Sequence, residues 1–252
     1  MTWNPREADV KDFLTGREIP DIGAEANRQA VARYLLTTPI RDELPRLPRL
    51  LRVVEGQTAR PLVWVVVDDG SRDGSREWLE EAAAGRPWME LIAARRRSEG
   101  YLSNLGQIQR WGLERAFELA PREVDFAGTL DADVTLPPEH YEAIGRAFEA
   151  DPRLGVASSQ LHVDGAPEPF RRADQPRGPT QTFRRRCLEE IGGFPPYPSP
   201  DSIANVKARL RGWRCAVLPE LIAELDRPTS GRYGELDGYR RLGRRTWFLG
   251  LH

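Results

Sequence analysis

The sequence predicts one α/β domain built on a mostly parallel sheet with helices on its faces. Residues 62–67 are apolar along their whole length, as expected for a strand buried on both faces. Strand patterns and helix patterns alternate along the first half of the chain, which is typical of right-handed βαβ units. A chain of 252 residues with 40% hydrophobic and 30% charged residues fits one large soluble domain.

The elements of the first half follow from hydrophobic periodicity, taken in order along the chain. The first helix is predicted by four apolar residues with i, i+3, i+4, i+7 spacing: Leu47, Leu50, Leu51 and Val54. A second helix is expected to begin with Ser75 as its cap. We expect strands at residues 34–38, 62–67, 89–93 and 126–130, and helices at residues 47–54, 75–83, 104–119 and 138–150.

The second half of the chain has a less regular pattern. Residues 164–179 are rich in proline, glycine and arginine, which favours a loop. We expect strands at residues 156–163 and 214–218, and helices at residues 187–191 and 201–210. The expected organisation is a polar N-terminal arm, residues 1–32, followed by a single domain, residues 33–252.

Composition restricts the class of protein and its compartment. A formal net charge of -1 gives no general attraction to nucleic acid. The two cysteines, Cys187 and Cys215, lie far apart in the sequence and are expected to be buried or free thiols in a reducing compartment. Residues 1–16 lack the apolar core of a signal peptide, and no apolar run is long enough to span a membrane. We therefore expect a cytoplasmic protein. The sequence does not decide whether it also contacts the inner face of the membrane.

The first motif that carries chemistry is V-V-V-D-D-G-S-R-D-G-S at residues 65–75. Asp68 and Asp69 follow directly on the predicted buried strand, and ligands of open α/β sheets bind beyond the carboxyl ends of the strands. We expect Asp69 to contact a nucleotide, whereas Asp73 fits a turn that caps the next helix. A match to an EF-hand calcium loop begins at Asp69, but that motif needs an entering helix where this sequence predicts a strand.

The second motif is Leu130-Asp131-Ala132-Asp133, at the end of the strand predicted for residues 126–130. Residues two apart on an extended chain point the same way, so Asp131 and Asp133 are expected to present two carboxylates to one spot. Hard oxygen ligands of this kind suit Mg²⁺ or Mn²⁺, which also bind substrate phosphates.

The two motifs together resemble those of glycosyltransferase family 2, whose members have the GT-A fold. Three further stretches support the resemblance in the same order along the chain. Residues 38–43 (T-P-I-R-D-E) look like the loop after the family's first strand, usually P-x-x-N-E. Residues 183–194 resemble the acceptor-side segment, and residues 200–213 resemble the helix that bears the catalytic base. The resemblance implies a Rossmann-like, mostly parallel sheet flanked by helices, with a less regular acceptor-side second half.

The resemblance assigns nucleotide-sugar contacts residue by residue. It implies that Pro39 and Glu43 line the nucleotide pocket and that Asp69 contacts the base. It further implies that Asp131 contacts the ribose or the donor sugar.

The same resemblance implies a metal site and a general base. Asp133, with Asp131, would hold Mg²⁺ or Mn²⁺ against the diphosphate, and Asp201 would take the proton of the acceptor hydroxyl. Many relatives carry a histidine just before an arginine near the C-terminus, where this sequence has Asp226 before Arg227. That departure leaves metal binding by Asp226 open.

The implied activity is that of a metal-dependent, hexosyltransferase-like glycosyltransferase in polysaccharide or glycoconjugate synthesis. It would move a sugar from a nucleoside-diphosphate sugar, with a UDP-sugar as the default, to a hydroxyl of a carbohydrate or lipid-linked acceptor. Attack from the face opposite the leaving group would invert the anomeric centre, although the sequence also leaves a retaining transferase open.

The sequence leaves two other functions as alternatives. A non-catalytic subunit with the same fold would bind nucleotide or a partner without turnover, and the departures at Asp42 and Asp226 leave room for it. A sugar-phosphate nucleotidyltransferase usually carries a glycine-rich loop with an arginine after its first strand, and residues 38–41 contain no glycine.

Overall fold

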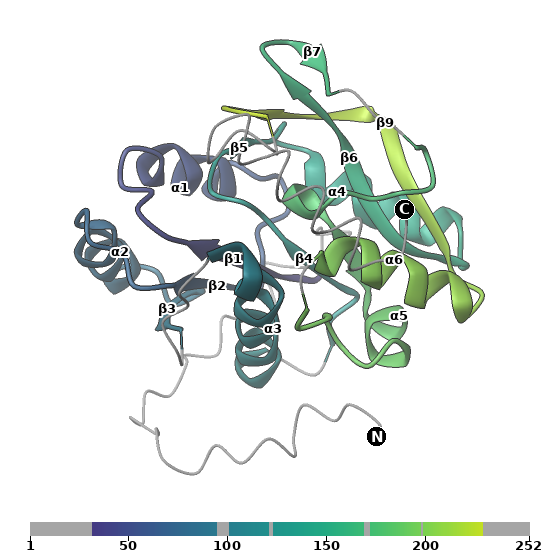
Figure 1. The fold of residues 1–252 in the computed structure, drawn as a ribbon, viewed down its shortest axis with the longest axis horizontal. Helices are drawn as coiled ribbons and strands as arrows, with labels where there is room; N and C mark the ends of the chain where they lie inside the picture. The colour runs from purple at the N-terminus through teal and green to yellow at the C-terminus, as the bar shows by residue number, and fades with distance from the viewer. Residues whose placement is uncertain (1–31, 95–100, 121–122, 169–171, 198, 229–252) are drawn as a thin grey trace.

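A nine-stranded sheet with helices on both faces organises the chain in the computed structural model (Figure 1). The structure describes residues 32–94, 101–120, 123–168, 172–197 and 199–228. The predicted N-terminal arm lies outside the described residues apart from Ala32, and the last part of the predicted domain, residues 229–252, lies outside them as well.

The four strands of the first half lie side by side in the order β3-β2-β1-β4, and every pair among them is parallel. Their bounds are β1, Tyr34–Ile40; β2, Val63–Asp68; β3, Met89–Ala93; and β4, Phe126–Thr129. All residues of β1, β2 and β4 are buried, as the apolar patterns predict. Because these strands are parallel, their carboxyl ends meet at one edge of the sheet.

Side chains alternate between the two faces of the sheet and build one hydrophobic cluster on each. On one face, Leu36 and Trp64 pack with α1 (Leu47–Glu55), α2 (Ser75–Ala84) and α4 (His140–Ala150). On the other face, Leu35 and Val65 pack with α3 (Tyr101–Leu119), α5 (Arg185–Glu190) and α6 (Pro200–Leu210). The four apolar residues that predict α1 are all buried, which confirms that helix.

The prediction that Ser75 caps α2 is wrong in its assignment of the cap. Ser75 is the first residue of the helix, and Gly74 precedes it with a φ of 91°. Asp73 Oδ1 accepts hydrogen bonds from the backbone N–H of Ser75 (3.0 Å) and from its hydroxyl (2.6 Å). Asp73 thus accepts a hydrogen bond from the first N–H group of the helix, as predicted for this residue. The hydroxyl oxygen of Ser75 can therefore accept a hydrogen bond from a neighbouring loop.

The second half adds antiparallel and parallel strands to the same sheet. β8 (Thr182–Arg184) runs antiparallel between β4 and β6 (Leu154–Val163), and β9 (Arg214–Leu225) runs parallel to β6. Two short strands, β5 (Val134–Thr135) and β7 (Ala166–Pro167), pair with β9 and β6. β9 is longer than predicted. Pro219 and Glu220 interrupt the apolar pattern after Leu218, but the strand continues past them with a slip in its pairing to β6.

Residues 164–179 are less uniformly a loop than the sequence predicts. The segment contains β7 and the start of a 3₁₀ turn, η1 (Gly178–Thr180), and residues 169–171 lie outside the described part. Both cysteines are free and buried, as predicted. Among the helices of the described ranges, none combines the length and apolar character needed to cross a bilayer.

Candidate active site

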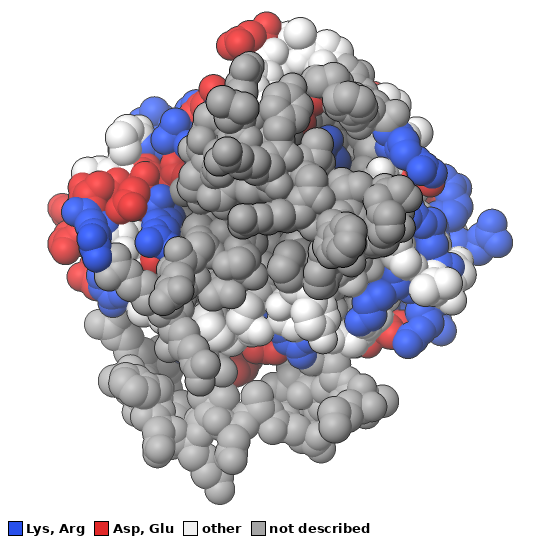
Figure 2. All heavy atoms as spheres, in the orientation of Figure 1, with Lys and Arg blue, Asp and Glu red and all other residues white. Residues whose placement is uncertain are grey.

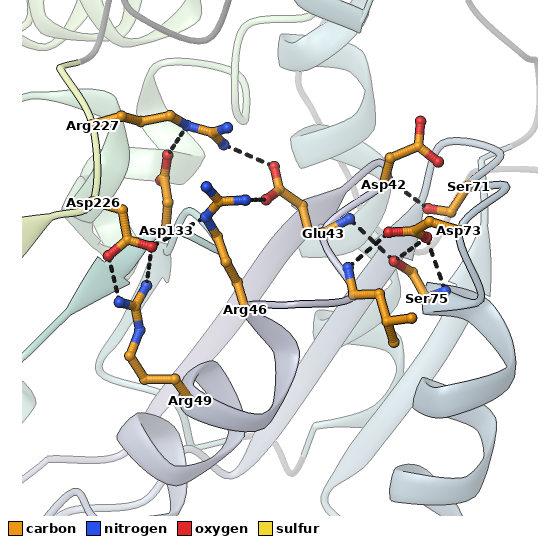
Figure 3. A network of polar contacts seen from close by, with 11 residues as sticks. Asp42, Glu43, Arg46, Arg49, Ser71, Asp73, Ser75, Asp133, Asp226 and Arg227 are labelled. Carbon is orange, nitrogen blue, oxygen red and sulfur yellow. Dashed lines mark hydrogen bonds and ion pairs between the residues drawn. The ribbon is translucent and has the colours of Figure 1, made fainter.

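The candidate site lies where β1, β2 and β4 end, and hydrogen bonds join the first two of the loops that follow (Figure 3). The backbone N–H of Asp42 donates to Ser71 Oγ (3.0 Å), and Asp42 Oδ1 accepts from the N–H of Arg72 (2.7 Å). The N–H of Leu44 donates to Asp73 Oδ2 (2.9 Å). Asp42 has a φ of 55°, a left-handed conformation that asparagine and aspartate tolerate better than most residues. The acidic side chain at this position therefore suits the turn itself.

Glu43 is the buried centre of a network of carboxylates and guanidinium groups (Figure 3). Its side chain is 1% exposed. Arg46 Nη1 donates to Glu43 Oε2 (3.0 Å), and Arg227 Nη2 donates to Glu43 Oε1 (2.9 Å). The backbone N–H of Glu43 donates to Ser75 Oγ (3.1 Å). The two oxygens of this predicted nucleotide-site residue are thus held by one arginine three residues away and by another 184 residues away in the sequence.

Arg227 also connects Glu43 to Asp133, the predicted metal ligand (Figure 3). Arg227 Nε donates to Asp133 Oδ2 at 2.6 Å, a short distance typical of a charge-assisted bond. Burial lowers the pKa of Arg227, and the charges of Asp133 and Glu43 raise it by more, so the net pKa lies above its ordinary value. One guanidinium therefore lies between carboxylates from the loops that follow β1 and β4.

The segment that contains Asp131 and Asp133 is a turn, which corrects the extended geometry assumed from the sequence. Residues Ala132 and Asp133 lie in this turn, and the N–H of Val134 donates to the carbonyl of Asp131 (3.4 Å). The alternation rule for extended chains therefore does not apply here. The turn is held in place on its far side by the N–H of Asp226, which donates to the carbonyl of Asp133 (3.0 Å).

Asp226 is engaged by Arg49 of α1 and by Arg46, the residue that precedes this helix. Arg49 donates through both Nη atoms to the two carboxylate oxygens, and Arg46 Nε donates to Oδ2 (3.1 Å). Burial raises the pKa of Asp226, and the hydrogen bonds and charges of Arg49 and Arg46 lower it by more, so it lies below its ordinary value. In this arrangement Asp226 ties β9 to α1.

Asp69 and Pro39 lie at the ends of neighbouring strands. Asp69 is fully buried, and its Oδ2 accepts from Arg41 Nη1 (3.2 Å). The backbone N–H of Asp69 donates to the carbonyl of Ile40 (2.9 Å), which extends the pairing of β1 and β2 by one residue. Pro39 pairs in register with Val67 one residue before the end of β1. The three predicted nucleotide-site residues before position 70 thus all lie at one edge of the sheet.

The turn η1 joins the Asp131 region to Asp201. The N–H of Asp131 donates to the carbonyl of Pro179 (3.1 Å), and Thr129 Oγ1 donates to the carbonyl of Gly178 (2.9 Å). A Cβ atom at Gly178 would lie 3.7 Å from Cβ and 3.8 Å from Oδ2 of Asp201. Asp201, in the first turn of α6, therefore lies close to η1, the turn to which the backbone of Asp131 is hydrogen-bonded.

Gln181 and Asn205 hold the start of α6 against the sheet. Gln181 Nε2 donates to the carbonyl of Asp201 (3.2 Å) and to Asn205 Oδ1 (2.9 Å). Asn205 Nδ2 in turn donates to the carbonyl of Pro176 (2.8 Å). These buried amides position the helix that carries Asp201 relative to η1.

The carboxylates of the site are candidate ligands for a divalent cation. In the described part of the chain, no group of three or more His, Cys, Asp or Glu side chains is arranged to hold a metal. Mg²⁺, however, is commonly held by one or two carboxylates together with waters and substrate phosphates. The hard oxygens of Asp131 and Asp133 fit that mode, with Asp133 Oδ2 engaged by Arg227.

Sequence reasoning missed the arginines of this site, namely Arg41, Arg46 and Arg49. The signal was present as three basic residues at close spacing in the stretch after the first strand. Their partners lie up to 180 residues away in the sequence, so spacing alone does not reveal the pairing.

The sequence profile of the family described as "Glycosyl transferase family 2" matches residues 36–200, more than half of the chain and all of the first-half site residues. The chain belongs to this family. It shares 37% identity over 109 residues with the undecaprenyl-phosphate 4-deoxy-4-formamido-L-arabinose transferase of Pseudomonas fluorescens (strain Pf0-1). The match covers 41% of this chain and 28% of that relative, so the chain spans less than a third of the relative's length.

Solved structures of glycosyltransferases share the fold of this family member. The mannosyltransferase PcManGT from Pyrobaculum calidifontis, in complex with GDP-Man and Mn²⁺, has a TM-score of 0.59 at 21% identity, covering 79% of this chain and 58% of its own. S. aureus TarS 1–349 in complex with UDP-GlcNAc has a TM-score of 0.61 at 18% identity, covering 83% and 64%. GalNAc-T7 with UDP, GalNAc and Mn²⁺ has a TM-score of 0.61 at 14% identity, covering 78% and 44%. The GT-A fold implied by the sequence motifs is thereby confirmed.

Proposed function

We propose that this glycosyltransferase family 2 chain moves a sugar from a nucleoside-diphosphate sugar to an acceptor, through a single GT-A domain over residues 33–252. The observation that carries the proposal is the gathering of Glu43, Asp69 and Asp133 where three parallel strands end, in a chain that belongs to this family. Strand ends of open α/β sheets are where nucleotides bind.

The donor is proposed to bind along the ends of β1, β2 and β4. Asp69 would accept hydrogen bonds from the base, with its other oxygen near Arg41. Pro39 and Glu43 would line the pocket, and Asp131 would contact the ribose or the donor sugar. The structures of TarS and GalNAc-T7 are in complexes that contain uridine nucleotides, which supports a UDP-sugar as the first donor to try.

A divalent cation, Mg²⁺ or Mn²⁺, is proposed to be held by Asp133 with Asp131. Such an ion would neutralise charge on the departing diphosphate. Arg227 would move from Asp133 toward the anionic diphosphate when donor and ion bind, because the guanidinium group recognises phosphate well. The complexes of PcManGT and GalNAc-T7 contain Mn²⁺, which supports manganese as the ion to use in the assay.

Asp201 is proposed as the general base that takes the proton of an acceptor hydroxyl. A positioned base typically contributes about 10²–10⁴-fold to rate. Its place in the first turn of α6, beside η1 and the Asp131 region, supports this role. Attack on the face opposite the diphosphate would invert the anomeric centre.

The donor site is tested by thermal unfolding with UDP, GDP, dTDP and CDP, each with and without Mn²⁺. A ligand at 100 times its dissociation constant adds about 2.7 kcal/mol of stability, which raises the melting temperature measurably. We expect a shift with one nucleotide that needs the metal and is lost in Asp133→Asn. The control Glu80→Gln, in an exposed pair on α2, should keep the shift. No shift with any nucleotide would favour a protein that does not use a nucleotide donor.

The acceptor chemistry is tested with Asp201→Asn. A hydroxyl acceptor needs its proton removed, so turnover should fall about 10²-fold or more while the nucleotide shift remains. A polyprenyl phosphate, suggested by the name of the Pseudomonas relative, attacks through an oxygen that carries no proton. Turnover that survives Asp201→Asn with such an acceptor would therefore assign the phosphate as the nucleophile. A protein that binds nucleotide but turns over neither acceptor class would be a binding subunit.

A further inference from the structure

The outward side of α6 carries an apolar stripe. Val206 and Leu210 are 49% and 80% exposed, and they lie four residues apart on one face of the helix. Ile203, half-buried, lies on the same face one turn earlier. A surface helix of a soluble domain normally turns polar residues to this side. The described residues include only four exposed large hydrophobic side chains, and two of them are in this stripe.

Cationic side chains flank the stripe. Lys207 and Arg211 lie along one side of it and Arg209 along the other, according to the helical spacing of α6. Figure 2 shows Lys and Arg side chains gathered along the edge of the molecule where α5, α6 and the start of β9 lie in Figure 1. Arg186, on α5, is also exposed.

The charges around Lys207 leave it available for an anion. Within the described ranges, Lys207 forms no ion pair with a carboxylate, whereas Arg186 pairs with Glu190 and Arg209 with Asp174. Burial lowers the pKa of Lys207, and the like charges of Arg211 and Arg110 lower it further. An anion placed beside this group would relieve that repulsion.

We propose that the outward face of α6 docks on a membrane surface that contains anionic lipids. Val206 and Leu210 would enter the boundary between headgroups and acyl chains, and Lys207, Arg209 and Arg211 would meet lipid phosphates. An apolar stripe bordered by basic residues is the composition of helices that lie in the membrane interface.

The test is sedimentation of the full chain with vesicles of phosphatidylcholine alone and of phosphatidylcholine with phosphatidylglycerol at 3:1. We expect binding to the anionic vesicles at low salt and loss of binding at high salt. Val206→Gln/Leu210→Gln should weaken binding about tenfold or more, because two apolar side chains no longer leave water. Lys207→Gln should weaken it about fivefold. The matched controls Ile222→Gln, an exposed apolar residue of β9, and Arg76→Gln, on α2, should bind as the unchanged protein does.

Several outcomes would overturn the proposal. Absence of binding to anionic vesicles would do so, as would equal binding by Val206→Gln/Leu210→Gln with an unaltered unfolding curve. A dimer seen by analytical ultracentrifugation and abolished by the same double change would assign the face to a second copy of the chain. The nucleotide shift in thermal unfolding, measured on the same variants, separates failure of membrane docking from failure of the proposed transferase site.

Discussion

Replacement of Glu43 by glutamine tests whether the arginine network around the site stabilises the fold. The change keeps the size of a side chain that is 1% exposed and removes its charge. Glutamine can still accept from one of Arg46 and Arg227, but its amide N–H₂ then faces the other guanidinium, which can only donate.

The magnitude follows from the bonds that are lost. A hydrogen bond to a charged group contributes about 1.5–3 kcal/mol, and loss of one partner of a fully buried ion pair costs about 3–5 kcal/mol. Arg46 still pairs with Asp226 and Arg227 with Asp133, and both arginines are partly exposed, so the loss should be close to that of one charged hydrogen bond and smaller than that of a fully buried ion pair. We expect Glu43→Gln to lower the free energy of unfolding by about 2–3 kcal/mol.

The assay is urea unfolding followed by circular dichroism, with Glu80→Gln as the matched control. Glu80 pairs with Arg76 on the surface of α2, where an i, i+4 pair contributes about 0.3–0.5 kcal/mol. A difference of less than about 0.5 kcal/mol between the two variants, or a Glu43→Gln protein more stable than the unchanged one, would show that the arginine network does not stabilise the fold.

Two further predictions concern packing and pH. A Cβ atom at Gly112 of α3 would lie 1.9 Å from Thr37 Oγ1, so Gly112→Ala should cost about 1–3 kcal/mol or more in urea unfolding. Gly85→Ala, with no atom within 4 Å of the new Cβ, should stay within about 0.5 kcal/mol, and equal effects would contradict the close approach of α3 to β1. Burial raises the pKa of Asp226 and Arg49 lowers it by more, so its pKa in the folded protein lies below the unfolded value of about 3.9. Such a carboxyl group stabilises the folded state at pH values above its unfolded pKa, and this stabilisation is lost as the pH falls through the lower folded pKa. The free energy of unfolding should therefore fall less steeply below about pH 4 in Asp226→Asn than in the unchanged protein, and parallel pH profiles would contradict this.

The elements of the first half could be predicted because their evidence is local. β2 is apolar at every position but its last, and the four buried residues of α1 repeat with the period of a helix. The helix start at α2 was assigned to the wrong residue because Asp73 and Ser75 are both good capping side chains, and only contacts to the neighbouring loop separate them. The sequence predicts too short a β9, because Pro219 and Glu220 interrupt the apolar pattern, whereas in the structure the strand resumes after a slip in register.

The acidic residues of the site could also be found from the sequence, but their surroundings could not. Asp69 and Asp133 follow strand patterns that identify the edge of the sheet where they lie. The turn at Ala132 and Asp133 depends on backbone hydrogen bonds to Pro179 and Asp226, which no local sequence pattern predicts. The extended geometry assumed for Asp131 and Asp133 was therefore wrong, although their place beyond β4 was right.

The family, the alternation of strands and helices, and the acidic residues beyond the strand ends could all be inferred from the sequence alone, because burial periodicity and motif order are properties of neighbouring positions. Which charged side chains meet depends on the three-dimensional arrangement of the strands and loops. Arg227 contacts Glu43 across 184 residues and Asp133 across 94, and Arg49 contacts Asp226 across 177. The energy of an ion pair depends on distance in space and on burial, and the sheet order sets both by bringing the loops after β1, β4 and β9 together.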